Sequence, residues 1–157
     1  MQMNKISKRL GFNKIVSAGI VVVRMVDDEP LFLLLRSWNF WDSPKGRVEP
    51  GESDLEAAIR ETGEEASIPK DKLDFKWGTQ YHETEPYRKK KDKIGRYFVA
   101  LTAQEEIELP INEELGKPEH EEYRWVTYDK AQEMTNARIG GVLKWANDKV
   151  KEGKENG

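Results

Sequence analysis

The stretch GRVEPGESDLEAAIRETGEEASI, residues 46–68, decides the fold of this chain. It begins as a loop rich in glycine and proline and continues as a segment whose apolar residues have helical spacing. The residues of this apolar stripe, at i, i+3, i+4, i+7 and i+11, are Leu55, Ala58, Ile59, Thr62 and Ala66. We expect the helix to begin near Ser53 and to end near Ala66 or Ser67, because the residue before Pro69 disfavours helical geometry.

The second half of this expected helix is dense in carboxylates. Glu61, Glu64 and Glu65 are spaced i, i+3 and i, i+4, so they share adjoining parts of one helical surface. A solvated acidic face is the ordinary interpretation, but the three charges repel one another and lie where the helix dipole disfavours them. A divalent cation would reverse that penalty. Carboxylate oxygens without histidine or cysteine favour Mg²⁺ or Mn²⁺ over zinc.

Runs of β-branched and apolar residues elsewhere predict a sheet. We expect strands over 15–26, 31–36, 73–83, 94–102 and 123–128, and further helices over 128–134 and 139–150. The stretch 38–51 is expected to be a loop and the tail 151–157 to fray. Gly19, inside the first strand, indicates a bulge or a close backbone approach. The absence of repeats and linkers predicts a single domain over 1–157, with a core from about 15 to 150 and flexible termini.

The composition limits the classes of function. The 157 residues include 26 Lys and Arg against 29 Asp and Glu, a net charge of -3, so any anion-binding surface must be local. The absence of cysteine excludes disulfide scaffolds, thiolate zinc sites and cysteine nucleophiles, and two histidines argue against a histidine zinc site. No apolar run approaches the roughly 18 residues of a membrane span, and the basic N-terminal stretch lacks the apolar part of a secretory signal. We therefore expect a cytoplasmic protein without membrane or DNA partners.

The stretch 46–68 resembles the Nudix box, G-x5-E-x7-R-E-U-x-E-E-x-G-U, in which U is a bulky apolar residue. The positions in register are Gly46, Glu52, Arg60, Glu61, Glu64, Glu65 and Ile68. Thr62 stands at an apolar position, where its methyl group can still pack. Ser67 replaces the last glycine, so either the serine takes the left-handed conformation at a cost of about 1 kcal/mol or the helix ends differently. Neither change removes a candidate metal ligand.

This resemblance implies an α/β fold, an α/β/α sandwich around a mixed sheet, and metal-dependent hydrolysis of a nucleoside diphosphate linked to another group. Carried over by position, the metal ligands are the Gly46 carbonyl and the carboxylates of Glu61, Glu64 and Glu65. Arg60 would orient the glutamates, and Glu52 would be a supporting carboxylate. Mg²⁺, or Mn²⁺ as a substitute, would neutralise charge on the pyrophosphate and acidify the attacking water, whose proton a glutamate accepts.

Flanking residues narrow the resemblance to one branch of the family. The loop WDSPKGRVEPGE, residues 41–52, is similar to that of asymmetrical diadenosine tetraphosphate hydrolases, and EHEEYRW, 119–125, matches those enzymes and RNA 5′-pyrophosphohydrolases. The similarity implies that Glu119 is a fourth catalytic carboxylate, either a metal ligand or the general base; on its own it would be an exposed loop acid. Tyr97 stands where the tetraphosphate hydrolases carry a tyrosine that stacks on adenine, a contact worth about 1–3 kcal/mol.

Several cations are candidates for binding substrate. Lys45 in the SPKG turn and Arg36 at a strand end could contact phosphates or could be ordinary surface cations. The stretch YRKKKDK, 87–93, which includes Lys93, could neutralise a polyphosphate or RNA backbone, or could simply keep a hairpin loop soluble. His82 and His120 are expected to be structural or exposed, with phosphate binding left open.

These expectations describe a Mg²⁺-dependent pyrophosphohydrolase that cleaves dinucleoside polyphosphates such as diadenosine tetraphosphate to ATP and AMP. The alternative enzyme removes pyrophosphate from triphosphorylated RNA 5′ ends, and the sequence does not separate the two. A Nudix-fold module that binds a nucleotide without hydrolysing it is a third possibility, which the presence of all three box glutamates disfavours.

Overall fold

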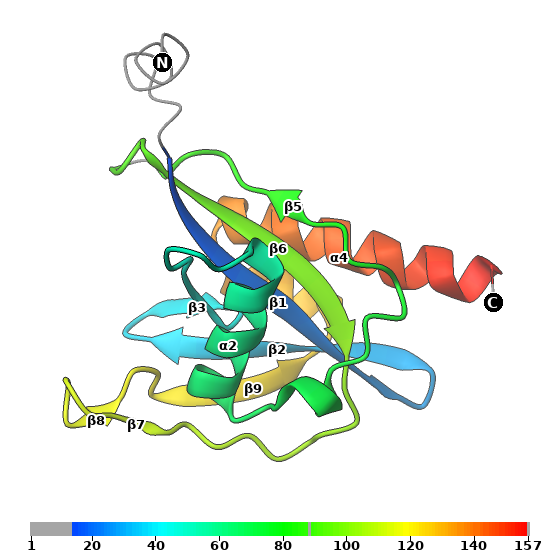
Figure 1. Cartoon of the computed structure of the whole chain (residues 1–157). Helices are drawn as coiled ribbons and strands as arrows, with labels where there is room; N and C mark the ends of the chain where they lie inside the picture. The colour runs from blue at the N-terminus through cyan, green and yellow to red at the C-terminus, as the bar shows by residue number, and fades with distance from the viewer. Residues whose placement is uncertain (1–13, 88, 157) are drawn as a thin grey trace, which may run out of the picture.

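The structure, a computed structural model, describes residues 14–87 and 89–156 (Figure 1). The strands are β1 (Ile15–Val26), β2 (Glu29–Ser37), β3 (Phe40–Asp42), β4 (Lys45–Arg47), β5 (His82–Glu83), β6 (Lys93–Leu101), β7 (Ile111–Asn112), β8 (Lys117–Pro118) and β9 (Glu122–Val126). The helices are α2 (Asp54–Ala66), α3 (Tyr128–Met134) and α4 (Ala137–Asn156), with a short 3-10 helix at Lys70–Lys72. In the described part, a seven-stranded sheet has the order β3-β2-β1-β6-β5, with β4 paired to β1 and β9 paired to β2.

The sheet is mixed, as the resemblance implied. Strand β1 pairs in parallel with β6, from Ile15 opposite Lys93 to Val23 opposite Leu101, and antiparallel with β2 and β4. A central strand covered on both faces has an apolar run rather than an alternating pattern. The side chains of residues 20–23 are accordingly all fully buried.

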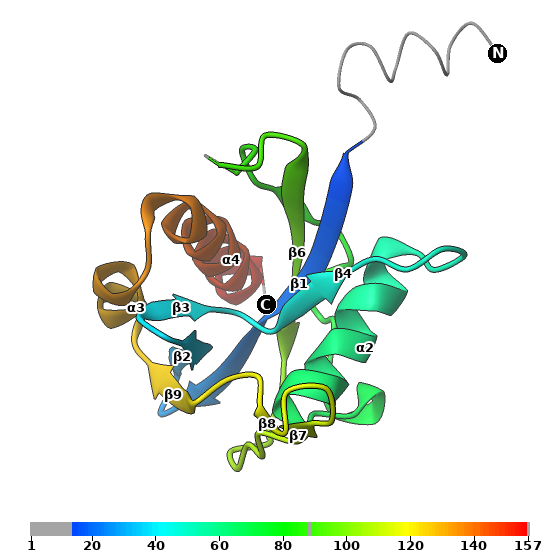
Figure 2. The same ribbon diagram turned by 90° about the vertical axis from the view of Figure 1, so that its left-hand side faces the viewer.

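Helices cover both faces of this sheet, with α2 on one side and α3 and α4 on the other (Figure 2). Because side chains alternate along a strand, β1 contributes to two separate cores. Ile20 and Val22 belong to the core beneath α2, whereas Val21 and Val23 belong to the core beneath α4. The predicted α/β/α sandwich is therefore confirmed.

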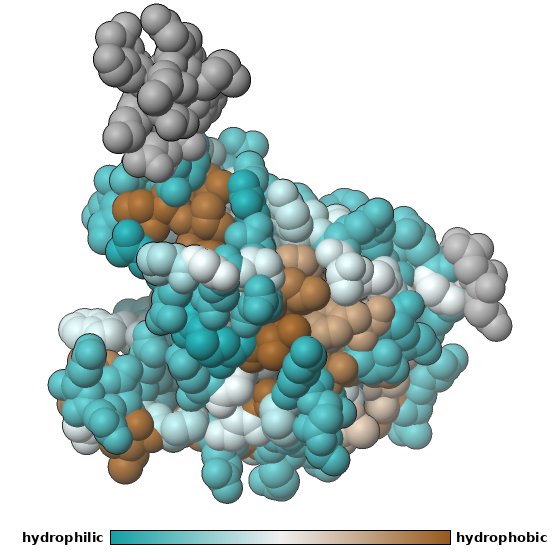
Figure 3. Space-filling view, in the orientation of Figure 1, coloured by the Kyte–Doolittle hydropathy of each residue, from teal (hydrophilic) through white to brown (hydrophobic). Residues whose placement is uncertain are grey.

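The surface that carries α2 is mainly hydrophilic, and hydrophobic residues reach it only in small patches (Figure 3). Two of the exposed hydrophobic side chains, Ile111 and Leu115, belong to the β7–β8 hairpin. In the part of the chain that the structure describes, no helix is long and apolar enough to cross a bilayer.

The segment 73–83 is not the single strand that its composition predicts. Asp74 forms an isolated bridge with Leu101, and only β5 at the end of the segment is a strand. A turn separates the two, in which the N–H of Gly78 donates to the carbonyl of Phe75 at 2.9 Å and Gly78 has a φ of 100°. Glycine adopts this conformation at no steric cost, so the turn interrupts the strand here.

Three further expectations are corrected. The loop expected over 38–51 contains β3 and β4, and the β7–β8 hairpin has no counterpart among the predicted strands. The tail expected to fray is helical, because α4 continues to Asn156. A contact stabilises that end of α4: a Cβ at Gly153 would lie 2.6 Å from the ring of Trp77. The N-terminal residues, also expected to be flexible, lie outside the described part of the chain.

The close backbone approach predicted at Gly19 is confirmed. A Cβ there would lie 2.5 Å from the carbonyl oxygen of Pro44 and 2.7 Å from the Cβ of Lys45. Strand β4 can therefore lie directly on β1, opposite Ser17–Gly19. This packing brings the loop before α2 against the helix itself.

Candidate active site

Helix α2 has defined caps at both ends, which fix its carboxylates in space. At its start the Ser53 hydroxyl accepts the N–H of Glu56 at 3.1 Å, and the Glu56 carboxylate accepts the N–H of Ser53 at 3.0 Å. At its end Ser67 has φ 55° and ψ 37°, so this serine takes the left-handed conformation, and its N–H donates to Gly63. Thr62 is buried, and its hydroxyl donates to a carbonyl one turn earlier.

Gly46 of β4 lies against the carboxylate of Glu61. A Cβ at this position would lie 2.0 Å from Glu61 Cδ and 2.2 Å and 2.3 Å from its two oxygens, so any side chain here would displace the carboxylate. The Glu61 side chain is 14% exposed. Burial and the charge of Glu65 raise the pKa of Glu61 to about 7, although Arg60 acts in the opposite direction.

Glu65 lies deeper, at the last turn of α2. Its Oε2 accepts the backbone N–H of Lys45 at 2.9 Å, and its Oε1 lies 3.3 Å from Nε2 of His120, in the loop before β9. That distance allows an ion pair, but the ring is not aligned for a hydrogen bond, and neither ring nitrogen has a hydrogen-bond partner among the described residues. Burial raises the pKa of Glu65, while His120 and the N–H of Lys45 oppose the rise. His120 is largely buried beside the candidate acids, so of the two expectations the exposed one is wrong; a structural role and phosphate binding both stay predictions.

The charge of His120 responds to these acids. Burial lowers the pKa of the imidazole, but the nearby carboxylates of Glu65, Glu119 and Asp42 more than compensate, so the net shift is upward. The sequence shows only that His120 follows Glu119. It does not show that His120 lies beside Glu65, because these two residues meet through the tertiary fold.

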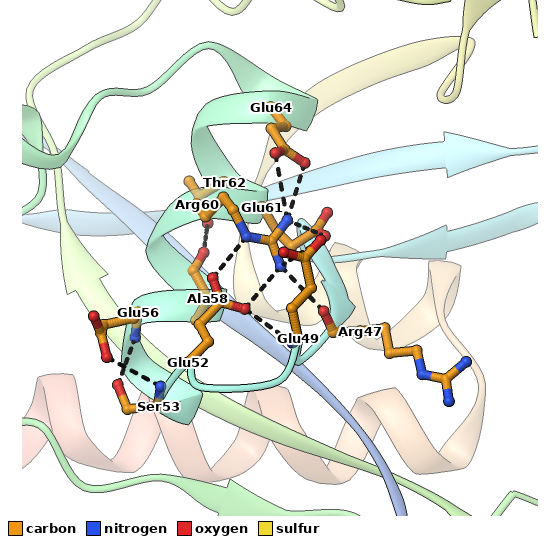
Figure 4. Close-up of polar contacts among 10 residues, drawn as sticks. All are labelled: Arg47, Glu49, Glu52, Ser53, Glu56, Ala58, Arg60, Glu61, Thr62 and Glu64. Carbon is orange, nitrogen blue, oxygen red and sulfur yellow. Dashed lines mark hydrogen bonds and ion pairs between the residues drawn. The ribbon is translucent and has the colours of Figure 1, made fainter. Parts of the chain in front are cut away.

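Arg60 connects the loop before α2 to the glutamates (Figure 4). Its guanidinium donates to both carboxylate oxygens of Glu52, at 2.7 Å and 3.0 Å, and to the carbonyl of Arg47 at 3.1 Å. The same group donates to Glu61 at 2.8 Å and reaches Glu64 at 3.2 Å. Hydrogen bonds from Arg60 lower the pKa of Glu52 to about 2. These contacts have the form expected of a positioning arginine and a supporting carboxylate.

The other candidate carboxylates border two neighbouring cavities. Glu64, Glu65, Glu119 and His120 line a cavity of about 680 Å³ beside the β7–β8 hairpin. A smaller cavity of about 170 Å³ connects Glu65, Glu119 and His120 to Lys45. Glu61 lines a different cavity, of about 490 Å³, next to Arg47. The structure therefore brings Glu119 to the same cavities as Glu65, while Glu61 lines a separate cavity and still lies close enough to Glu65 for their charges to interact.

The oxygen atoms of this site can be compared with the ligands that a divalent cation binds. Carboxylates and a backbone carbonyl are hard oxygen ligands. The backbone at Gly46 lies directly against the Glu61 carboxylate, and burial together with the charge of Glu65 raises the pKa of Glu61. In the described residues, no three acidic or histidine side chains already surround one point. Instead the Arg60 guanidinium lies between Glu61 and Glu64. The residues fit a divalent cation in their chemistry, and the individual ligands stay predictions.

Tyr97 does not offer a platform for a base. Its side chain is fully buried between the sheet and α4, and its hydroxyl donates to the carboxylate of Asp42 at 3.1 Å. The predicted stacking on adenine is therefore corrected: the ring has no exposed face in this structure. Burial raises the pKa of Asp42, and the charge of Lys45, 3.9 Å away, and the hydroxyl of Tyr97 oppose that rise.

The candidate phosphate-binding cations differ in their surroundings. Arg36 already has two acidic partners, with Glu122 at 3.1 Å and Glu121 at 3.0 Å. Lys45 borders the cavity of Glu65, whereas Lys93 lines a separate cavity near α4. Lys45 is thus the candidate cation that the structure places beside the acids.

The three-layer sandwich, the acidic end of α2 and the glycine of β4 beside it are together the features expected of the predicted family. The chain matches the family model described as NUDIX domain over residues 14–146, and it belongs to the Nudix family. The predicted family is confirmed. A single domain over 1–157 stays a prediction.

The curated relatives of this chain belong to narrower groups within the family. The chain is 34% identical over 134 residues to a bis(5′-nucleosyl)-tetraphosphatase [asymmetrical] from Caenorhabditis elegans, covering 82% of this chain and 91% of the relative. It is 35% identical over 127 residues to the Sus scrofa protein of the same name, covering 75% and 82%. An RNA pyrophosphohydrolase from Pelagibacter ubique is 27% identical over 154 residues, covering 85% and 90%. The crystal structure of a C. elegans Ap4A hydrolase binary complex matches with a TM-score of 0.72 at 27% identity, covering 91% of this chain and 99% of that one.

Proposed function

We propose that this chain is a Mg²⁺-dependent pyrophosphohydrolase that cleaves dinucleoside polyphosphates, with diadenosine tetraphosphate split into ATP and AMP and with Mn²⁺ as a substitute metal. The observation that carries the proposal is the buried carboxylate of Glu65, held by Lys45 and His120 in a cavity that Glu119 also lines. The hydrolase class follows from the Nudix family and its curated relatives, and the substrate follows from the similarity to asymmetrical tetraphosphatases.

Five groups would hold the metal: the Gly46 carbonyl and the carboxylates of Glu61, Glu64, Glu65 and Glu119. A bound divalent cation would neutralise charge on the phosphate oxygens and lower the pKa of a water molecule. Arg60 contributes by position, because its guanidinium fixes Glu61 and Glu64 relative to Glu52. The backbone N–H of Lys45 holds Glu65 in one orientation, so the carboxylate needs little reorganisation when substrate enters.

The proton of the attacking water needs an acceptor. Glu65 and Glu119 both line the cavity next to Lys45, and a carboxylate there can accept the proton as a general base. His120 lies beside both acids, and its positive charge would limit the build-up of negative charge as the pyrophosphate enters. Lys45 lines the same cavity, where its ammonium group can contact a phosphate oxygen.

Replacing Glu65 tests the site. Glu65→Gln keeps the size of the side chain but removes its charge, so turnover of diadenosine tetraphosphate should fall by roughly a thousand-fold or more while the fold persists. Products are resolved by ion-exchange chromatography with Mg²⁺ present, and thermal unfolding followed by circular dichroism reports the fold. Glu133→Gln is the matched control, because Glu133 is an exposed acid of α3. A folded Glu65→Gln variant that keeps most of its rate would contradict the assignment.

RNA 5′ ends are the second candidate substrate. The relative named RNA pyrophosphohydrolase and the lysines of the β5–β6 loop favour this alternative. Triphosphorylated RNA and diadenosine tetraphosphate should be compared at increasing salt, because an RNA backbone bound by several lysines loses affinity steeply as salt rises. A cytoplasmic location stays a prediction from the sequence.

A further inference from the structure

A buried carboxylate that has no part in the proposed mechanism lies beside the candidate active site. Asp42 is the last residue of β3, and its side chain is 6% exposed. It lines the cavity of about 170 Å³ that Glu65 and Glu119 also line. Burial of a carboxylate is costly unless the charge is both paired and hydrogen-bonded. The contacts of Asp42 must therefore explain why a charge is buried here.

Two groups fix the orientation of this carboxylate. Oδ1 of Asp42 accepts the backbone N–H of Ser43 at 2.6 Å, and the Tyr97 hydroxyl lies 3.1 Å from Oδ1 and 3.2 Å from Oδ2. The tyrosine ring belongs to the core beneath α4 and is fully buried. A glycine makes room for it, because a Cβ at Gly95 would lie 2.8 Å from Cε1 of the ring. The sheet thus holds Asp42 from its interior, through the hydroxyl of Tyr97.

Lys45 supplies the opposite charge. Its Nζ lies 3.9 Å from Oδ2 of Asp42, which is three residues earlier in the same turn. The backbone of this turn is fixed on β1, because the carbonyl of Pro44 accepts the N–H of Ile20 at 3.2 Å and Lys45 lies opposite Gly19. The turn therefore keeps the carboxylate and the ammonium group close together.

Two acids compete for the Lys45 ammonium group. The Glu65 carboxylate, which accepts the backbone N–H of Lys45, lines the same cavity as Asp42. Burial lowers the pKa of Lys45, but nearby negative charges, of which that of Asp42 has the largest effect, raise it above its ordinary value. An ammonium group paired with Glu65 would occupy a carboxylate that the proposed mechanism needs. Pairing with Asp42 leaves Glu65 free.

The charge of Asp42 is needed only towards Lys45. A carboxamide oxygen could accept the N–H of Ser43 and the hydroxyl of Tyr97 equally well, so these two contacts do not require an acid. The ammonium group, by contrast, is attracted by the full negative charge, and the attraction is strengthened by burial.

We propose that Asp42 is a positioning residue, which holds the Lys45 ammonium group where a substrate phosphate can reach it and away from Glu65. Tyr97 is a second positioning residue, which acts on the reaction through Asp42. This inference rests on the proposed function for the identity of the substrate.

A double-mutant cycle on the hydrolysis of diadenosine tetraphosphate tests the inference. Asp42→Asn should lower kcat/KM roughly ten-fold when Lys45 is present but less than about two-fold in the Lys45→Gln background, where no ammonium group is left to position. Tyr97→Phe keeps the buried ring and should lower kcat/KM roughly three-fold, again with little effect in the Lys45→Gln background. The Tyr97→Phe cycle decides the question if Asp42→Asn does not fold.

Tyr128→Phe and Asp54→Asn are the matched controls. Tyr128 packs against the same core as Tyr97, and its hydroxyl accepts the side chain of Gln132 at 3.0 Å. Asp54 pairs with Arg96 at 2.8 Å and does not line the cavity described above. Both controls should leave kcat/KM unchanged within about two-fold.

A purely structural role gives a different result in this cycle. Asp42 and Tyr97 would then affect thermal unfolding, while kcat/KM would either stay unchanged in the folded variants or fall by the same factor with and without Lys45. Either outcome would overturn the inference.

Binding of inorganic pyrophosphate separates this inference from the proposed function. In isothermal titration calorimetry with Mg²⁺ present, Asp42→Asn should weaken binding roughly ten-fold when Lys45 is present and leave the binding of Lys45→Gln unchanged. An original chain that shows this coupling but cleaves no dinucleoside polyphosphate would refute the proposed function alone. Cleavage without the coupling would overturn the inference alone. Tighter binding by Asp42→Asn would also overturn it, because the carboxylate would then act by repelling phosphate.

Discussion

Gly46 stands where the backbone of β4 passes closest to the carboxylate of Glu61. We expect Gly46→Ala to displace that carboxylate, because the new Cβ would lie 2.0 Å from Glu61 Cδ. A displacement of about 1 Å can cost roughly 100-fold in turnover, whereas the flexible end of a glutamate can move at little cost in stability. Steady-state kinetics and thermal unfolding separate the two effects.

Gly51→Ala is the matched control for this substitution. Gly51 has a φ of 83°, and a methyl group added there would meet no atom within 4 Å. Alanine at this position should therefore cost about 1 kcal/mol of stability through backbone strain and leave turnover unchanged. If Gly46→Ala and Gly51→Ala had the same kinetics, close packing at Gly46 would have no role in the site.

The Glu52–Arg60 pair predicts how stability responds to acid. The pKa of Glu52 is about 2 in the folded chain against an ordinary value of 4.5, so the pair stabilises the fold fully above pH 4.5. This contribution is lost as pH falls from 4.5 through 2, because the Glu52 carboxylate becomes protonated and no longer forms a charged pair with Arg60. Glu52→Gln should therefore flatten the pH dependence of the unfolding free energy in that window, measured by urea unfolding at several pH values. An unchanged slope would mean that the pair contributes nothing.

At the scale of single elements, local signals decide which predictions succeed. Helix α2 was predictable because its caps and its apolar stripe all lie within one short stretch, and β1 matches its predicted range because most of its residues are apolar and many are β-branched. The strand predicted over 73–83 was wrong because propensity gives no weight to the turn that Gly78 makes. The prediction for the end of α4 was wrong because local composition does not show that Trp77, far away in the sequence, packs against Gly153.

The same distinction applies to the site. The glutamates of α2 could be predicted because their spacing lies on one helix. His120 comes to Glu65 from the loop before β9, so this pair has no signature in the sequence. Tyr97 could be assigned to its strand, but its burial depends on the packing of α4 over the sheet.

The C-terminal cap of α2 predicts a stabilising substitution. Ser67 has a φ of 55°, a conformation that costs a side-chain-bearing residue more than it costs glycine. Ser67→Gly should therefore raise the free energy of unfolding by roughly 0.5–1 kcal/mol, a few degrees in Tm, and leave turnover unchanged. Its carbonyl, which accepts the side chain of Gln104 at 3.0 Å, remains in the variant.

Ser53→Ala at the other end of the same helix is the counterpart. It removes the hydroxyl that caps α2 and should cost about 1 kcal/mol. Thermal unfolding should show that Ser67→Gly raises the stability and Ser53→Ala lowers it. The gain in Ser67→Gly is expected only if the left-handed conformation of Ser67 costs stability. A loss of stability in Ser67→Gly would show that the serine side chain itself stabilises the helix end.

Across the whole molecule, each face of the sheet has its own apolar core, one beneath α2 and the other beneath α4. The carboxylates of the candidate active site belong to α2 and to the loop before β9, and none of them is a member of either apolar core. Changes at these carboxylates should therefore alter activity more than stability.

Removal of the metal tests this independence. Both cores consist of apolar side chains from the sheet and helices, so a chelator should abolish turnover while the circular dichroism spectrum stays unchanged. Added Mg²⁺ should raise Tm, because binding to the folded state at 100 times Kd stabilises it by about 2.7 kcal/mol. At roughly 2–4 °C per kcal/mol the rise is about 5–10 °C, and Glu65→Gln should reduce it, with ionic strength matched by KCl. If the chelator unfolded the chain, the cation would be part of the core. If Mg²⁺ left Tm unchanged, the crowded carboxylates at the end of α2 would have to be stabilised by Arg60 and His120 alone.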